Sequence, residues 1–256
     1  MKNVTFLLNS CDSHSEAWEP FFLLLKRMWT SLDYPIILNT ETKNFEMDGL
    51  CIKTINTPVS ESWSDRLMKV LDRIDTSYVL IFLEDFFLES PIDLEHYNKF
   101  LNFIINNNDV GCISFHNSPD GLVSSGELTN YALLKPNARF RASCQVALWR
   151  TDVLKKILRK HENAWEFEVW ASKRSGRLPY RFYSIIPGIP EAFDYDLGKP
   201  IYRGSWNMES VTRIMKKTGV TITTESLPNI ATMKDLKVTP KKCTLKDIFK
   251  RLKSIF

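Results

Sequence analysis

Glycine is scarce in this chain, with nine glycines in 256 residues, and none of them forms a phosphate-binding loop. Neither G-x-x-x-x-G-K-[ST] nor G-x-G-x-x-G occurs, the patterns that bring backbone amides close to phosphates. The nucleophile elbow G-x-S-x-G is also missing. These absences count against P-loop ATPases, Rossmann dehydrogenases, sugar nucleotidyltransferases and elbow-type hydrolases. A nucleotide would have to be held by side chains, a metal ion and strand-end loops.

Cysteine and histidine show no metal-binding or disulfide spacing. The five cysteines are an odd number without paired spacing, which predicts reduced, mostly buried thiols rather than a disulfide framework or a zinc site. The four histidines are scattered along the chain. His116 follows an expected strand end and could face a site, although a hydrogen-bonded loop histidine is the plainer interpretation.

Long apolar runs are missing as well. No run approaches the roughly 18–20 apolar residues that span a bilayer, and the N-terminus leads directly into a strand without the apolar core of a signal peptide. The composition, 44% hydrophobic and 12% aromatic, is that of a globular protein. We therefore expect a cytoplasmic protein whose size fits one α/β domain with a full core, or two small domains.

Positive charge is concentrated at the C-terminus. Residues 240–256 hold six bases and one acid, a net charge of +5. The rest of the chain has 28 bases and 29 acids, a net charge of −1, so the whole chain carries +4. A nearly neutral body argues against a nucleic-acid groove. We expect a domain over residues 1–230 and a basic tail over 231–256. The tail's apolar residues share one face of an amphipathic helix: Leu245, Ile248, Phe249, Leu252, Ile255 and Phe256. This helix could lie on an anionic membrane surface, or pack on the domain or a second subunit.

Strand and helix patterns alternate through the first half of the chain. This order predicts an α/β fold with a mostly parallel central sheet flanked by helices. Strands are expected at 4–8, 34–38, 50–55, 78–83, 110–115 and 181–186, and helices at 18–29, 62–74, 93–106 and 151–159. Ser62 or Ser64 should cap the second helix. Residues 116–130 lack periodicity, as lids and binding loops do, and residues 139–149 look extended.

The most apolar strand ends in two acids. Tyr78–Leu83 predicts a strand buried on both faces, and Glu84 and Asp85 follow it directly. Ligands of α/β sheets bind outside the carboxyl ends of the strands, and carboxylates placed there could hold a divalent cation for a diphosphate. Alternatively, the two acids form a solvated turn or a helix N-cap.

A second acidic cluster lies among aromatic residues. Glu166 and Glu168 are flanked by Trp165, Phe167 and Trp170. A carboxylate desolvated by indole rings could act as a general base on an acceptor hydroxyl. The alternative is a helix start whose acids complement the helix dipole.

Two arginines alternate with an aromatic residue. On an extended segment, Arg139 and Arg141 would point to one face, with Gln145 on the same parity. The two cations could neutralise a leaving diphosphate or contact the acceptor, or they could pair with surface acids.

Several stretches, taken in order, resemble a bacterial glycosyltransferase family with the nucleotide-diphospho-sugar transferase (GT-A) fold, of the surface-polysaccharide type. The match covers roughly residues 1–210. It rests on Asn9-Ser-Cys-Asp12, Trp18-Glu-Pro-Phe-Phe22, Tyr34–Glu41, Trp63-Ser-Asp-Arg66, Glu84-Asp85-Phe-Phe-Leu88, Ser143–Trp149, Trp165-Glu-Phe-Glu168 and Tyr202-Arg-Gly-Ser-Trp206. The Glu-Asp-Phe sequence departs from the strict Asp-x-Asp element of that fold.

The resemblance implies a role for each site residue. Mn²⁺ or Mg²⁺ would be held by Asp85 first and Glu84 second. The donor nucleotide would contact Asn9, Asp12 and Asn39, with Arg66 near the diphosphate. Glu166 or Glu168 would be the base.

The same resemblance implies a function. The expected activity is transfer of a sugar from a UDP- or GDP-linked donor to a saccharide or lipid-linked acceptor in capsule or lipopolysaccharide synthesis. It would be metal-assisted and inverting by analogy, with retention left open. The basic tail would place the enzyme at the inner face of the plasma membrane. The alternatives are a non-catalytic nucleotide- or sugar-binding relative and a structural component of a polysaccharide assembly complex.

Overall fold

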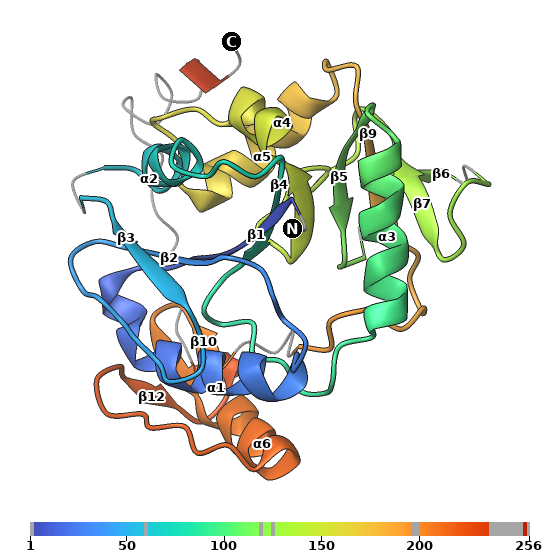
Figure 1. Ribbon diagram of the computed structural model, residues 1–256. Coiled ribbons are helices and arrows are strands. Elements are labelled where there is room, and N and C mark those ends of the chain that lie inside the picture. Colours follow the sequence, from blue (N-terminus) through green and yellow to red (C-terminus); the bar gives the residue numbers. More distant parts are fainter. Residues whose placement is uncertain are drawn as a thin grey trace.

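A nine-stranded sheet runs through the molecule (Figure 1). The computed structural model describes residues 3–58, 61–117, 120–123, 126–195, 200–235 and 253–254. The sheet has the order β3-β2-β1-β4-β8-β5-β9-β7-β6. Its strands are β1 (Val4–Asn9), β2 (Ile36–Thr40), β3 (Ile52–Asn56), β4 (Tyr78–Phe82), β5 (Val110–Ser114), β6 (Leu122–Val123), β7 (Tyr131–Leu134), β8 (Ala147–Arg150) and β9 (Arg181–Ile185). All strands point the same way except β7 and β8. The expected mostly parallel sheet is therefore confirmed, with these two strands making it a mixed sheet.

The central strands are buried on both faces, as the apolar runs predict. Every residue of β1 and of β4 is buried, and the two strands pair in parallel with Phe6 opposite Leu80 and Leu8 opposite Phe82. Because side chains alternate along a strand, Phe6 and Leu8 contribute to one apolar cluster and Leu7 to the other. The sheet therefore has an apolar core on each side.

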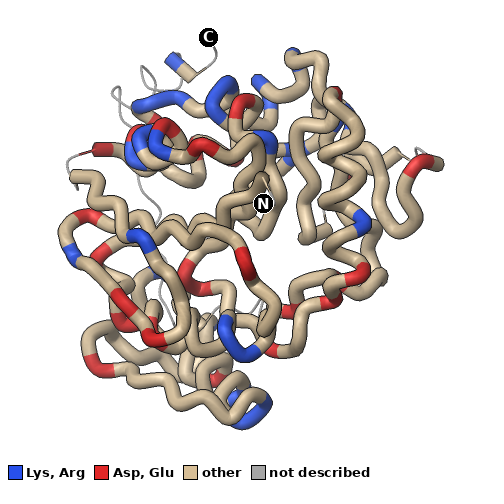
Figure 2. Tube along the Cα trace, viewed as in Figure 1, with Lys and Arg blue, Asp and Glu red and all other residues tan. Residues whose placement is uncertain are grey.

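Helices cover both faces of the sheet (Figure 1). α1 (Trp18–Met28) and α3 (Leu94–Asn106) bury their apolar sides in one cluster, and α2 (Trp63–Leu71), α4 (Thr151–Ile157) and α5 (Ala164–Ser175) do so in the other. Ser62 caps α2 by accepting a hydrogen bond from the Asp65 amide at 3.1 Å. Lys, Arg, Asp and Glu are interspersed along the trace (Figure 2).

A small second sheet packs on the α1 side of the large one. It consists of β10 (Ile201–Tyr202), β11 (Ser205–Asn207) and β12 (Asn229–Ile230). In the chain, α6 (Met208–Thr218) lies between β11 and β12, and the 3₁₀-helix η2 (Met233–Asp235) follows β12. Glu16, on the 3₁₀-helix η1 (Asp12–Ala17), accepts a hydrogen bond from the Trp206 indole at 2.7 Å and from the Ser226 amide at 2.9 Å. These bonds fasten the small sheet beside η1. The division of the chain at residue 230 stays a prediction.

The expected extended segment over 139–149 is wrong. Turns and bends run as far as Val146, Phe140 has a φ of 54°, and only Ala147–Arg150 form a strand. The reason is topological: β9 and β5 lie between β7 and β8 in the sheet, so the connection has to cross them and cannot run straight. Arg139 and Arg141 consequently do not share a face.

The end of the tail contacts the body of the protein. The amphipathic helix expected over 240–256 lies outside the described residues, apart from 253–254. Ser254 is buried, shares a 2.8 Å hydrogen bond with His161 Nε2, and accepts one from Arg174 Nη1 at its carbonyl oxygen, also at 2.8 Å. Arg174 is itself paired with the buried Glu162. These contacts support packing of the tail on the domain. Within the described ranges, no helix has the length and apolar character needed to cross a bilayer.

Deleting residues 253–256 should lower the melting temperature by about 2–6 °C, because Arg174 loses one acceptor of its buried guanidinium. Thermal denaturation of the truncated protein measures the effect. Lys253→Ala is the control: Lys253 is exposed and next to Ser254, so its loss should leave the melting temperature unchanged. A truncated protein as stable as the full chain would show that the Ser254 contact contributes nothing.

Candidate active site

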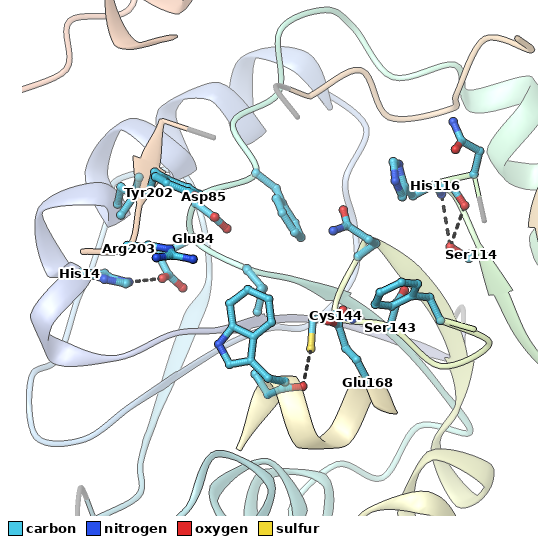
Figure 3. Close-up of a pocket in the computed structure, with 18 of the residues that line it drawn as sticks. His14, Glu84, Asp85, Ser114, His116, Ser143, Cys144, Glu168, Tyr202 and Arg203 are labelled. Atoms are coloured by element: carbon cyan, nitrogen blue, oxygen red, sulfur yellow. Dashed lines mark hydrogen bonds and ion pairs between the residues drawn. The ribbon is translucent and has the colours of Figure 1, made fainter. Parts of the chain in front are cut away.

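A cavity of about 570 Å³ opens at the carboxyl ends of the parallel strands. In α/β sheets this is the edge where ligands bind, and the volume suits a small organic ligand. The walls come from four places: η1 and the end of β4, the end of β5, the turns before β8 with the start of α5, and the β10–β11 hairpin. Labelled in Figure 3 are His14, Glu84 and Asp85; Ser114 and His116; Ser143, Cys144 and Glu168; and Tyr202 and Arg203.

The two acids after β4 lie in the cavity wall, and Glu84 has a partner there. Glu84 is buried and pairs with the His14 imidazole at Nδ1. Burial alone would lower the pKa of His14, but hydrogen bonds to Cys11 and Glu84 and the charge of Glu84 raise it to about 11. Asp85 lines the same wall. The chain then turns inward, because Phe86 and Phe87 are buried in the core.

The atoms around Glu84 fit a transition metal better than the expected Mg²⁺. Cys11, His14 and Glu84 each offer one ligand atom, and these atoms lie within 4.8 Å of one another. Mg²⁺ prefers oxygen ligands, whereas thiolate and imidazole suit zinc and its neighbours. Asp85 is outside this group. The assignment of Mn²⁺ or Mg²⁺ to Asp85 and Glu84 stays a prediction.

Three of the residues expected to bind the nucleotide hold one another. Asn39 Nδ2 donates to Asn9 Oδ1 at 2.6 Å, and Thr57 Oγ1 donates to Asn39 Oδ1 at 2.8 Å. Arg66 donates to Thr57 Oγ1 at 2.9 Å and to the Ser10 carbonyl at 2.9 Å, and it forms a buried ion pair with Glu41. The network joins the ends of β1, β2 and β3.

Asp12 organises the next loop. Its carboxylate accepts hydrogen bonds from the amides of Glu41 and Thr42, both at 3.0 Å, from Lys43, and from the Thr42 hydroxyl. Although burial opposes it, these bonds lower the pKa of Asp12 to about 2. Asn9, Asp12, Asn39 and Arg66 are not among the described residues that line the cavity. Their nucleotide-binding role stays a prediction, and the contacts show them building the wall that carries His14.

The structure separates the two glutamates of the aromatic cluster. Glu166 forms a capping box with Asn163: its carboxylate accepts from the Asn163 amide at 2.8 Å, and its own amide donates to Asn163 Oδ1 at 2.9 Å. Glu168 lines the cavity, where it accepts from the Cys144 amide at 2.9 Å. Trp165, also in the lining, is 73% exposed. Of the two, only Glu168 is among the described residues that line the cavity, and the role of either glutamate as the base stays a prediction.

The structure also places the two arginines apart. Arg139 is exposed and pairs with Asp120 at 2.8 Å. Arg141 is buried, donates to the Leu134 and Tyr180 carbonyls, and lies 4.3 Å from the centroid of the Phe182 ring. Neither arginine is in the cavity lining described here. The expected common face is therefore wrong, because backbone carbonyls hold the Arg141 guanidinium. The role of the two arginines as diphosphate or acceptor contacts stays a prediction.

The cavity lining also contains residues to which the sequence analysis gave no definite role. Gln145 does line the cavity and accepts from the Tyr195 hydroxyl at 3.1 Å. Tyr202, at the end of β10, and Arg203, in the β10–β11 turn with a φ of 52°, both line the cavity. The stretch Tyr202-Arg-Gly-Ser was part of the resemblance, but nothing in the sequence places this hairpin beside β4. His116 lines the cavity and pairs with Glu191 at 3.5 Å.

Comparison with known proteins identifies the fold. No family model matches the sequence, and no curated protein matches it. Among solved structures, S. aureus TarS aligns over 84% of this chain and 38% of its own, with 13% identity and a TM-score of 0.51. The chain shares its fold with part of TarS. Residues 1–349 of TarS align over 72% of this chain and 60% of theirs, with 13% identity and a TM-score of 0.48. A Leptospira borgpetersenii cytidylyltransferase aligns over 77% and 81%, with 11% identity and a TM-score of 0.46.

The alignments cover 60% and 38% of the two TarS chains, so this chain spans less than two thirds of the length of either. At 13% identity the likeness to TarS shows the fold alone. It confirms the α/β architecture with a mixed, mostly parallel sheet flanked by helices.

Proposed function

We propose that this protein is a glycosyltransferase that moves a sugar from a nucleotide-diphosphate donor to a saccharide or lipid-linked acceptor. One observation carries the proposal: a carboxylate, Glu168, and an exposed indole, Trp165, line the same strand-end cavity as the acidic pair Glu84 and Asp85. Figure 3 shows Glu168 on a different wall from the acidic pair. The two walls provide separate places for an acceptor and a donor.

The donor would lie along the wall formed by β4 and the β10–β11 hairpin. The carboxyl ends of the strands open there, and Arg203 brings a guanidinium into the cavity. A guanidinium neutralises phosphate charge through paired hydrogen bonds. A divalent ion, Mn²⁺ or Mg²⁺, would offset the negative charge of the diphosphate, and Asp85 would be the first carboxylate to bind it.

The acceptor would lie against α5. The Trp165 indole offers a flat apolar surface for the CH face of a sugar ring, as aromatic linings do in ligand sites. Glu168 would take the proton from the acceptor hydroxyl. The hydroxyl oxygen then bonds to the anomeric carbon, while the bond to the diphosphate breaks and its electron pair leaves with the diphosphate. Attack from the face opposite the leaving group inverts the anomeric centre.

The pathway and the cellular location that we propose follow from the resemblance to surface-polysaccharide glycosyltransferases. It places the enzyme in capsule or lipopolysaccharide synthesis, in the cytoplasm and next to the membrane that carries lipid-linked acceptors. TarS residues 1–349 form a complex with UDP-GlcNAc, with a TM-score to this chain of 0.46, and that compound is a practical first probe.

UDP- or GDP-sugars with Mn²⁺ should raise the melting temperature by about 5–10 °C at 100-fold excess over the dissociation constant. The physical reason is that a ligand bound to the native state alone stabilises it. A fluorescence thermal-shift screen measures this, followed by a transfer assay with saccharide acceptors. Ser143→Trp should abolish the shift by filling the cavity, and Arg139→Ala, outside the lining, should keep it.

The screen also separates the alternatives. A shift without transfer or donor hydrolysis would identify a non-catalytic nucleotide- or sugar-binding protein. No shift with any nucleotide would favour the structural component. A shift caused by a nucleoside triphosphate alone would favour nucleotidyl transfer over glycosyl transfer.

A further inference from the structure

We propose that Cys11, His14 and Glu84 bind one divalent transition-metal ion, with Zn²⁺ as the best fit, at the edge of the cavity. The spacing of cysteine and histidine in the sequence indicates no zinc site. The structure adds Glu84 to Cys11 and His14 and brings the three ligand atoms within 4.8 Å of one another. This goes beyond the proposed function, because metal binding by these side chains does not require sugar transfer.

The local backbone explains how the three side chains meet. Cys11 is the N-cap of η1 and His14 lies three residues later. His14 lies at a kink inside η1 (φ −104°, ψ 17°), and its amide donates to the Cys11 carbonyl at 3.1 Å, so this turn brings the two side chains near each other. Glu84 comes from the end of β4, which pairs in parallel with β1. Neighbouring parallel strands end at the same edge, so their following loops lie side by side.

Other contacts hold this segment in place before a metal arrives. Arg66 donates to the Ser10 carbonyl at 2.9 Å, immediately before Cys11. Asp12, immediately after it, is fastened to the loop that starts at Glu41. Glu84 follows a strand whose residues are all buried. A site whose ligands are positioned by rigid surroundings loses little conformational entropy when the ion binds.

The donor types select the metal. Thiolate sulfur, imidazole nitrogen and carboxylate oxygen together are suited to Zn²⁺ and similar ions, and unsuited to Mg²⁺ or Ca²⁺. Zinc bonds are about 2.0–2.3 Å long, so the ligand atoms would sit a little over 3 Å apart. For the ion to bind, the Cys11 thiol and the His14 imidazolium would release their protons to solvent, and the ion pair between His14 and Glu84 would have to open.

Three protein ligands leave a fourth position open. This is the ligand count of catalytic zinc centres, whereas structural ones have four protein ligands. His14 and Glu84 both line the cavity, so the fourth position faces it and can take water or an anionic oxygen such as that of a phosphate. The ion would thus supply positive charge at the donor wall.

The test is Co²⁺ substitution followed by absorption spectroscopy. Metal-free protein titrated with Co²⁺ should bind one equivalent and show the near-ultraviolet charge-transfer band of a cobalt–thiolate bond. Cys11→Ser should abolish this band, and His14→Gln should weaken binding at least 10-fold. Cys144→Ser is the matched control: Cys144 also lines the cavity but is outside the group, so its loss should keep the band. Zn²⁺ should displace Co²⁺, and excess Mg²⁺ should not.

Two outcomes overturn the inference: no thiolate band in the wild-type protein, or a band that persists in Cys11→Ser. If His14→Gln does not fold, Cys11→Ser alone decides. The result is independent of the proposed function, because a UDP- or GDP-sugar thermal shift in metal-free protein is a separate measurement. Nucleotide binding without the cobalt band removes only the metal site, and the band without nucleotide binding removes only the transferase.

Discussion

Replacing Glu168 with glutamine should lower turnover by about 10²-fold or more, because an amide cannot accept the proton of the acceptor hydroxyl. The donor dissociation constant should stay within about 3-fold of the wild-type value, since Glu168 is on the wall proposed for the acceptor. The Cys144 amide, which donates to Glu168 at 2.9 Å, can still donate to the amide oxygen of glutamine. Steady-state kinetics with saturating donor, together with a donor-binding titration, separates the two effects.

Glu166→Gln is the matched control, two residues earlier on the same helix. Glu166 is engaged in the capping box with Asn163, so its replacement should leave turnover near the wild-type rate. Glutamine can serve at this position of a capping box, so the loss of stability should not exceed about 1 kcal/mol. Wild-type turnover in Glu168→Gln, or an equal loss in both variants, would remove Glu168 as the base.

Replacing Arg66 with methionine should lower the free energy of unfolding by about 3–5 kcal/mol, because it leaves the buried Glu41 carboxylate without its cation. The hydrogen bonds to the Ser10 carbonyl and Thr57 hydroxyl are lost as well. These groups hold the loop that carries His14, so the donor thermal shift should shrink together with stability. Urea denaturation gives the change in unfolding free energy.

Arg139→Met shows how much of this effect depends on burial. Arg139 forms an ion pair with Asp120 in which the arginine side chain is 75% exposed, against 9% for Arg66 in its pair. Exposed pairs contribute about 0–1 kcal/mol, so Arg139→Met should change the unfolding free energy by no more than that. Equal effects of the two substitutions would contradict the structural role given to the Arg66 network.

The order of strands and helices in the first half of the chain could be predicted because it depends on local patterns, whereas most elements after residue 116 were not predicted. The run Tyr78–Leu83 is apolar without interruption, and β4 is buried on both faces as such a run requires. The place of Glu84 and Asp85 in a cavity also followed from a general rule about strand ends. Tertiary contacts decided the details, and the turns over 139–146 were missed because the crossing between β7 and β8 is not encoded locally.

The roles of individual side chains were harder to predict. Glu166 and Glu168 look equivalent in sequence, and only the contacts of Asn163 and Cys144 distinguish a helix cap from a cavity residue. Arg141 was predicted to contact phosphate because the carbonyl groups that it binds, those of Leu134 and Tyr180, belong to other strands and loops. Such partners cannot be read from the residues nearby in the chain.

The sequence by itself determined the main strands and helices of the first half of the chain, which of their faces are buried, and that carboxylates stand at the end of β4. Those properties come from short-range periodicity and from the cost of burying polar groups. Only the tertiary structure decided which carboxylate faces the cavity and that His14 meets Glu84, which is 70 positions away in the chain. The reason is that contacts over such separations depend on strand order and loop crossing, to which no local pattern corresponds.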